Sequence, residues 1–317
     1  WDVEVISNRS SDLIREIDLI EEIARLIGYD QFDQNLPAPI NPGKLNSYQL
    51  AKRKLKNGFV ISGFNEVLTY SLVSDEDKTR IKISNPLLQE TSCLRNNIWQ
   101  EHIRICNQNI KAGRESCWIF ETGNIFVNSS TNNQIEILSG AISGNNYDEK
   151  WEFSGKTSEL NYYQARGKLR QVFSHLNVSV IDKPTDKYKY LHPGRTSLLI
   201  IEGKEAGYFG QINPKYIAEK KSLKNLFLFS IDIDKLLMAA IRTNKWTPIF
   251  KDYPIVPKIE RDINFIFNKD YLVSDIIGNI KKSGKPILEE VKLIDIYNDD
   301  NLDDKFVSYT FRLSYRD

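Results

Sequence analysis

The order of strand and helix patterns in the last part of the chain limits its fold more than any other feature of the sequence. Residues 262–267 have a strand pattern, residues 273–282 a helical pattern, and residues 290–297 and 306–315 strand patterns again. The order strand, helix, strand, strand is the first part of a ferredoxin-like β-α-β-β-α-β unit. The chain stops at Asp317, before the second helix and the fourth strand, so we expect this domain to be truncated.

The residues before this tail mix helical and strand patterns, which favours an α+β fold. Strands are expected at residues 66–73, 116–127, 136–143 and 226–233, with a hairpin over residues 196–211. Helical spacing of apolar residues predicts helices at residues 18–27, 47–63, 97–112 and 160–176. In the last of these helices we expect five side chains to face the core: Tyr163, Leu169, Val172, Phe173 and Leu176.

Two proline-containing stretches divide the chain into three regions. Three prolines lie between Leu36 and Gly43, and two more lie in residues 251–260. We therefore expect domains at residues 1–40, 41–248 and 249–317.

Charge, cysteine content and hydropathy limit the partners and the compartment that this chain can have. The formal net charge of +1 creates no global positive field, so basic patches for a nucleic acid would have to be local. Three scattered cysteines without a CxxC pair indicate a reducing compartment. No apolar stretch approaches the roughly 18 residues of a membrane span, so we expect no membrane partner.

A cluster of carboxylates is the strongest candidate for a metal site. Asp18, Glu21 and Glu22 lie at helical positions i, i+3 and i+4, so they share one face of a helix that Asp18 caps and Gly28 ends. Asp12 lies six residues earlier and can fold back towards them. Oxygen ligands of this kind suit Mg²⁺. A solvated acidic first turn, favoured by the helix dipole, is the alternative, and spacing alone leaves both open.

The tail is the candidate RNA-binding region. Residues 249–317 hold eleven Lys or Arg and thirteen Asp or Glu, which argues against an unfocused electrostatic binder. Basic side chains nevertheless gather at the helix end and on one strand face. The candidates are Arg261, Lys281, Lys282, Lys285, Arg312 and Arg316.

Three aromatic side chains of the last strand have the opposite parity to Arg312 and Arg316. They are Tyr309, Phe311 and Tyr315. Either these rings form the core and the arginines face solvent or RNA, or the arrangement is reversed with the rings stacking on bases. The first arrangement is the more usual. Lysines at a helix end also complement the helix dipole.

Two other pairs of residues invite a catalytic interpretation. One interpretation of His192 and Arg195 is an acid–base group beside an anion-binding cation, but Pro193–Gly194 is a turn dipeptide, which favours a structural role. His102 and Cys106 share an apolar helix face, which favours burial over a reactive thiol–imidazole pair.

Several runs of residues, in order along nearly the whole chain, resemble the β subunit of phenylalanyl-tRNA synthetase, especially its cyanobacterial and plastid form. The run RSSDLIREIDLIEEIARLIGYDQF (residues 9–32) carries the family's Asp, Asp, LxEE and ARxxGYD pattern. Similar runs lie at residues 63–73, 83–98, 119–126, 191–200, 210–215 and 260–267. In the run at residues 210–215, Asn213 stands where the family usually has His.

This resemblance implies a specific architecture and site. It implies a class II aminoacyl-tRNA synthetase-like module, an antiparallel sheet with flanking helices, that is not catalytic and precedes a ferredoxin-fold anticodon-binding domain. ATP and phenylalanine would bind to a catalytic α subunit, in an α₂β₂ tetramer that charges tRNA(Phe). The positions assigned in the family to a Mg²⁺ shared with the α subunit match Asp12, Asp18, Glu21 and Glu22. The implied compartment is the plastid stroma, with a bacterial cytoplasm as the alternative.

Two other functions compete with this one. The chain can be a stand-alone tRNA- or RNA-binding or scaffold paralogue without ligase activity, or a Mg²⁺-dependent phosphoryl-transfer enzyme that uses the four carboxylates. Co-expression with a matching α subunit separates the three, because each predicts a different combination of association and activity.

Overall fold

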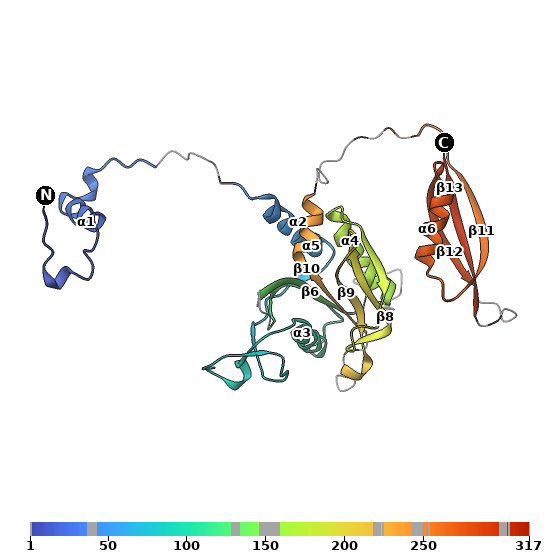
Figure 1. Cartoon of the computed structure of the whole chain (residues 1–317), viewed down its shortest axis with the longest axis horizontal. Helices are drawn as coiled ribbons and strands as arrows, with labels where there is room; N and C mark the ends of the chain where they lie inside the picture. Colours follow the sequence, from blue (N-terminus) through green and yellow to red (C-terminus); the bar gives the residue numbers. More distant parts are fainter. Residues whose placement is uncertain are drawn as a thin grey trace. The chain divides into compact units, whose positions relative to one another are not determined.

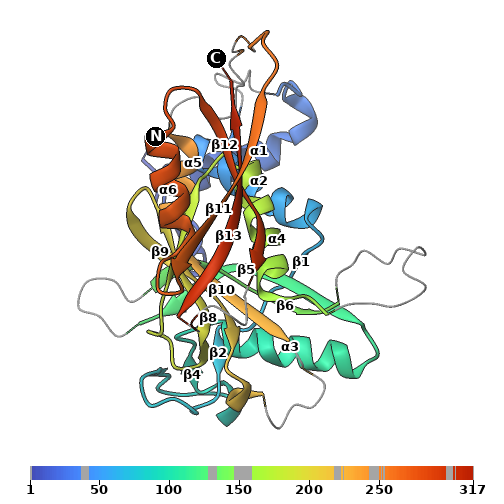
Figure 2. The same ribbon diagram turned by 90° about the vertical axis from the view of Figure 1, so that its right-hand side faces the viewer.

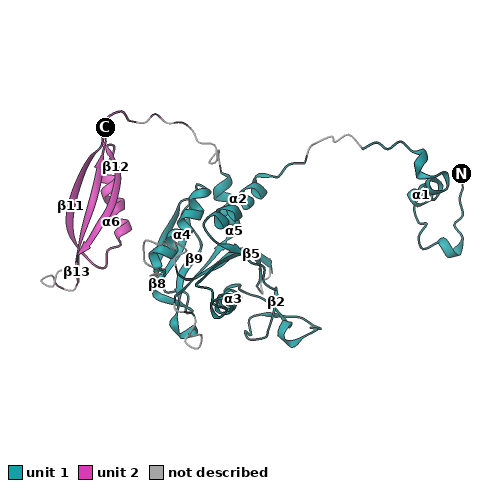
Figure 3. Ribbon diagram, turned by 180° about the vertical axis from the view of Figure 1, so that it is seen from behind, with its two compact units in different colours: residues 1–246 teal, residues 247–317 magenta. Residues whose placement is uncertain are grey.

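The computed structural model describes residues 2–36, 43–127, 134–145, 159–217, 223, 225–242, 250, 252, 254–297, 303 and 305–316. The chain forms two compact units, residues 1–246 and 247–317 (Figure 3).

The N-terminal segment contains one amphipathic helix, α1 (Glu16–Ile27), between the short 3-10 helices η1 (Ser7–Arg9) and η2 (Tyr29–Gln31). Gly28 ends α1 with φ +94°, as its sequence position predicts. The predicted start at Asp18 is wrong by two residues. Asp18 lies inside the first turn instead, where its carboxylate reaches back to accept hydrogen bonds from the N–H groups of Ile14 and Arg15, as in a capping box.

A seven-stranded sheet organises the first unit, in the order β1-β5-β6-β10-β9-β8-β7. Its neighbouring strands are antiparallel except for the β1–β5 pair, which is parallel. The strands are β1 (Asn65–Glu66), β5 (Ser116–Phe126), β6 (Gln134–Gly144), β7 (Val180–Pro184), β8 (Leu191–Ile201), β9 (Lys204–Ile212) and β10 (Leu226–Asp232).

Helices cover both faces of this sheet (Figure 1). One face packs against α2 (Ser47–Ile61), α4 (Tyr162–His175) and α5 (Ile233–Ile241), and the other against α3 (Trp99–Lys111). Alternation along β5 explains both cores: Trp118 and Phe120 join the first, whereas Cys117 and Ile119 join the second.

The predicted single strand over residues 66–73 is wrong. The chain pairs with β5 only in β1 and through the Val67 N–H, which donates to the Phe120 carbonyl over 2.9 Å. It then leaves the sheet, so that Leu68 and Tyr70 are 91% and 81% exposed. It pairs again in a separate small sheet of order β2-β4-β3, formed by β2 (Leu72–Val73), β3 (Ile81–Lys82) and β4 (Cys93–Leu94).

The other predicted elements of this unit lie within a few residues of their expected bounds, but one side chain is misassigned. Leu169, Val172, Phe173 and Leu176 are buried as expected, whereas Tyr163 is 83% exposed. Tyr163 lies on the outer face of α4, beside Tyr162, whose ring does pack towards the core.

The second unit has the predicted order of elements. Antiparallel strands in the order β11-β13-β12 form a sheet with α6 along one face (Figure 2). The elements are β11 (Ile259–Asn268), α6 (Val273–Ser283), β12 (Leu288–Tyr297) and β13 (Phe306–Tyr315). Tyr309 and Phe311 are 8% and 0% exposed beneath α6, so the aromatic residues form the core and Arg312 lies on the open face. With both units containing antiparallel sheets and helices, the predicted α+β class is confirmed.

Candidate metal centre and nucleic-acid interface

Two of the four candidate metal-binding carboxylates contact the same arginine. The Arg9 guanidinium donates from Nε to Asp12 over 2.9 Å and from Nη2 to Glu22 Oε1 over 2.6 Å. Arg25 binds the other oxygen of Glu22. Glu21 is exposed and makes no polar contact with the residues that the structure describes. The hairpin from η1 to α1 therefore brings Asp12 and Glu22 together on a cation of the chain itself.

The same contacts set the protonation of this segment. Hydrogen bonding to Arg9 lowers the pKa of Asp12 and of Glu22, and backbone N–H groups of Arg15 and Ile14 lower the pKa of Asp18. All three groups are therefore carboxylates at neutral pH.

The donor set and its arrangement lead to different conclusions about Mg²⁺. Four carboxylates in one short segment are hard oxygen donors of the kind that Mg²⁺ prefers. Within the described ranges, however, no group of three or more His, Cys, Asp or Glu side chains is arranged to hold a metal ion. The chemistry of the residues fits the ion, while Arg9, Arg25 and backbone N–H groups occupy oxygens of three of the four carboxylates, Asp12, Asp18 and Glu22.

The six basic candidates of the second unit lie in three places. The side chains at the end of α6 are exposed and have no partner among the described residues; they are Lys281, Lys282 and Lys285. Arg261 has the parity of the α6-facing side of β11. Arg312 lies on the open face, where it forms a bidentate pair with Asp262, and Arg316 lies 3.3 Å from Glu289. Among the described residues, the three lysines have no acidic partner, and Arg261 donates only to the Glu260 carbonyl over 3.0 Å, whereas Arg312 and Arg316 are each paired with a carboxylate.

The open face of the three-stranded sheet is polar and nearly neutral. Asn264 donates to Thr310 over 2.9 Å and accepts from Ser308 over 3.0 Å, so amide and hydroxyl groups form a row across two strands. Such groups can bind base edges, whereas the neutralised Arg312 adds little attraction for phosphate.

An exposed aromatic residue on this face, Tyr297, was not predicted from the sequence. A bulge between Leu293 and Asp295 shifts the parity of β12, so that Tyr297 pairs with Ser308 and lies on the open face, 56% exposed. Without the bulge, Tyr297 would share the face of Leu293 beneath α6. No residue pattern marks the bulge, and only the register reveals it.

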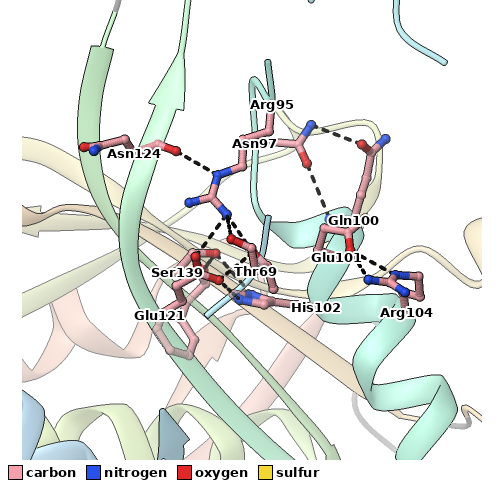
Figure 4. Close-up of polar contacts among 11 residues, drawn as sticks. Thr69, Arg95, Asn97, Gln100, Glu101, His102, Arg104, Glu121, Asn124 and Ser139 are labelled. Atoms are coloured by element: carbon pink, nitrogen blue, oxygen red, sulfur yellow. Dashed lines mark hydrogen bonds and ion pairs between the residues drawn. The ribbon is translucent and has the colours of Figure 1, made fainter. Parts of the chain in front are cut away.

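Residues of two family-like runs meet in a buried ion pair in the first unit (Figure 4). Arg95 Nη1 lies 3.0 Å from Glu121 Oε1, with side chains 3% and 0% exposed. Arg95 also donates to the Thr69 hydroxyl over 2.6 Å and to the Asn124 carbonyl over 2.8 Å. The Thr69 hydroxyl in turn donates to Glu121 over 2.7 Å. Each charge is therefore paired and hydrogen-bonded, as burial requires.

His102 completes this cluster from α3. Its Nε2 lies 3.5 Å from Glu121 Oε2, at the outer limit of a hydrogen bond, and its Nδ1 lies 3.5 Å from the Ser139 hydroxyl (Figure 4). Desolvation lowers the pKa of His102, which is therefore neutral. Burial alone would raise the pKa of Glu121, but contacts with His102, Thr69 and Arg95 lower it. With 0% exposure of both His102 and Glu121, this cluster is structural and offers no substrate access.

The structural interpretation of both catalytic-looking pairs agrees with the geometry. His192 Nδ1 accepts a hydrogen bond from the Gly194 N–H over 3.1 Å, and Arg195 donates to Gln211. His102 and Cys106 are both 0% exposed in the α3 side of the core.

Two protein families match the chain. Residues 34–233, more than half of it, match the family described as the phenylalanyl tRNA synthetase beta chain CLM domain. Residues 254–317 match the ferredoxin-fold anticodon binding domain. No helix in the described part of the chain has the length and apolarity that crossing a bilayer needs.

Curated relatives match over the full length of the chain. A protein of Prochlorococcus marinus strain MIT 9312, named phenylalanine--tRNA ligase beta subunit, is 66% identical over 316 residues. A protein of Synechococcus sp. strain CC9902 with the same name is 45% identical over 318 residues. The chain spans 39% of the length of each. A solved pyrrolysyl tRNA synthetase of Desulfitobacterium hafniense has a TM-score of 0.44 and 13% identity, covering 60% of this chain and 65% of its own.

Proposed function

Because this chain belongs to the phenylalanyl-tRNA synthetase β-subunit family, we propose that it is the part of a β subunit that supports a catalytic α subunit and binds tRNA. The intact enzyme would attach phenylalanine to tRNA(Phe) with ATP as the energy source. One observation carries this proposal: the module match at residues 34–233 and the anticodon-binding match at residues 254–317 follow each other in one chain.

The first unit has the properties expected of a supporting module. Its cluster around Arg95 and Glu121 is closed to solvent, and the sequence has no glycine-rich phosphate loop. We infer that the catalytic site belongs to the α subunit and that this module holds the assembly together, as two α and two β subunits.

We assign Mg²⁺ to the acidic hairpin. Asp12, Asp18, Glu21 and Glu22 would hold the ion, which would neutralise their mutual repulsion where the α subunit meets this segment. Arg9 performs part of that neutralisation in the chain alone.

We assign RNA binding to the second unit. The lysines that end α6 would attract phosphates, while the open face would bind bases through Asn264, Thr310 and the ring of Tyr297. Relatives of cyanobacterial origin favour a plastid stroma or a bacterial cytoplasm as the compartment.

A chimera tests the proposal directly. This segment replaces the corresponding 39% of the Prochlorococcus marinus β subunit, and the chimera is co-expressed with the matching α subunit. We expect an α₂β₂ complex by light scattering and charging of tRNA(Phe) with phenylalanine. The matched control is the same chimera carrying Glu121→Gln, which breaks the buried ion pair and should impair assembly.

Each competing function predicts another result. A stand-alone paralogue would bind tRNA as a monomer and fail to join the α subunit. A phosphoryl-transfer enzyme would turn over substrate without the α subunit. The relatives described above favour neither, since both are named ligase beta subunits.

A further inference from the structure

A pocket of about 520 Å³ lies between α4 and β7, on the face of α4 that turns away from the core. β7 is the edge strand of the seven-stranded sheet. One face of α4 forms a wall of the pocket, through side chains at i, i+4, i+7 and i+11: Tyr163, Gly167, Arg170 and Ser174.

The pocket is positively charged. No acidic residue occurs between Glu159 and Asp182, whereas this stretch includes Arg166, Lys168 and Arg170. Arg166 donates from Nε to Asp182 over 2.7 Å, which neutralises one charge. Arg170 is exposed and has no charged partner among the described residues, so one net positive charge remains in the pocket.

Two unused groups point to an anionic ligand. Arg166 is only 9% exposed, and its Nη1 has no hydrogen-bond acceptor within the described part of the chain, although buried donors are usually satisfied. Ser179 adds a hydroxyl with no partner among the described residues. A group with several acceptor oxygens would satisfy both and would pair with Arg170.

Gly167 keeps the wall of the pocket open. A Cβ at this position would meet no atom within 4 Å, so packing does not require glycine. Glycine in a helix interior nevertheless costs about 1 kcal/mol relative to alanine. Its presence here leaves room for a ligand close to the helix backbone.

Tyr163 adds a flat apolar surface at the rim of the pocket. Its ring is 83% exposed and meets the Tyr162 ring edge-on at 5.6 Å. An exposed ring beside arginine and serine side chains is the combination that single-stranded nucleic acids bind, through base stacking and phosphate contacts.

We propose that the α4–β7 pocket binds a phosphodiester of single-stranded RNA, with Arg170 and Arg166 facing the phosphate and Tyr163 stacking on a base. This pocket is a second RNA contact, separate from the anticodon-binding unit. The identification of its ligand as RNA rests on the tRNA-binding function proposed above. A free nucleotide has the same chemistry, so the test includes one.

The test compares variants of the full chain by fluorescence anisotropy with a tRNA(Phe) transcript over a series of salt concentrations. Arg170→Gln should weaken binding about 3- to 10-fold and reduce the magnitude of the log–log salt slope by about 0.7. Gly167→Leu should weaken binding by filling the pocket without lowering the unfolding midpoint. The matched control Arg114→Gln removes an exposed arginine next to α3, on the other side of the sheet, and should change neither quantity.

Each alternative outcome overturns the proposal. If neither Arg170→Gln nor Gly167→Leu changed the affinity for tRNA or the salt slope, the pocket would be excluded as an RNA-binding site. The proposed tRNA binding by the second unit would be unaffected by that result. Adenosine 5′-monophosphate binding that depends on Arg170, with RNA binding that does not, would assign the pocket to free nucleotides instead. Absence of any RNA binding by the full chain would overturn the proposed function as well.

Discussion

Replacing Glu121 by glutamine tests what holds the first unit together. The substitution keeps the shape of the side chain and removes its charge. The Arg95 side chain, which is only 3% exposed, then has no counter-ion. Arg95 would keep its contacts to Thr69 and Asn124, but breaking a buried ion pair by removing one partner costs about 3–5 kcal/mol. Since domains are stable by only about 5–15 kcal/mol, this is a large fraction of the total.

Urea unfolding followed by tryptophan fluorescence, to which Trp118, 1% exposed in the same unit, contributes, measures this loss. The matched control is Glu136→Gln, which removes the partner of Lys52 from a pair with side chains 31% and 28% exposed. A pair that exposed contributes less than about 1 kcal/mol. Equal losses in the two variants would refute the reasoning, because burial would then have no influence on the cost.

Three further perturbations have expected outcomes. Because the pKa of His102 is lowered in the fold, the unfolded chain binds more protons below about pH 6.5, so the urea midpoint should fall between pH 7 and pH 5. His102→Leu should abolish this change of the urea midpoint between pH 7 and pH 5, and an unchanged pH dependence would contradict its assignment to His102. The lowered pKa of Glu121 affects stability only at lower pH, where its stabilisation is lost on acidification. Arg9→Gln should tighten Mg²⁺ binding several-fold in calorimetry by releasing two carboxylates, and no difference from an Arg53→Gln control would contradict this. Replacing the three lysines that end α6 with glutamine should reduce the magnitude of the salt slope of tRNA binding by about 2. Arg312→Gln should change the slope little, because Asp262 already neutralises that arginine. A larger effect of Arg312→Gln than of the lysine substitutions would place the phosphate contacts on the open face instead.

Patterns confined to one segment predicted most of the fold. The strands β5, β6 and β13 and the helices α2, α3 and α6 lie within a few residues of their expected positions, because each is long and strongly periodic. The helix α5 was missed because its apolar residues continue the apolar run of β10, with only Asp232, Asp234 and Lys235 between the two.

Features that depend on distant partners were not predictable. Residues 67–71 alternate like a strand, but after Val67 they leave β5, and their next backbone hydrogen bond is the one that Ser71 accepts from the Arg95 N–H over 2.9 Å. Tyr163 belongs to the outward row of α4 with Gly167 and Arg170, and it is the neighbouring Tyr162 whose ring packs against the core.

The candidate sites follow the same division. Helical spacing placed Asp18, Glu21 and Glu22 on one helix face with Asp12 able to fold back towards them, but nothing in the spacing showed that Arg9 would bind both Asp12 and Glu22. The pairing of Arg95 with Glu121 joins residues 26 positions apart on different elements, and no local pattern encodes it.

The amphipathic helix α1 buries none of its residues, and Ile17, Ile20, Ile23 and Leu26 are each at least 50% exposed. A helix of 12 residues is marginal in water without tertiary packing. Docking of the proposed α subunit onto this stripe would therefore also be a folding reaction, in which part of the binding free energy is consumed by ordering the segment. The helicity of this segment would then rise with the concentration of its partner rather than with the stability of its own chain.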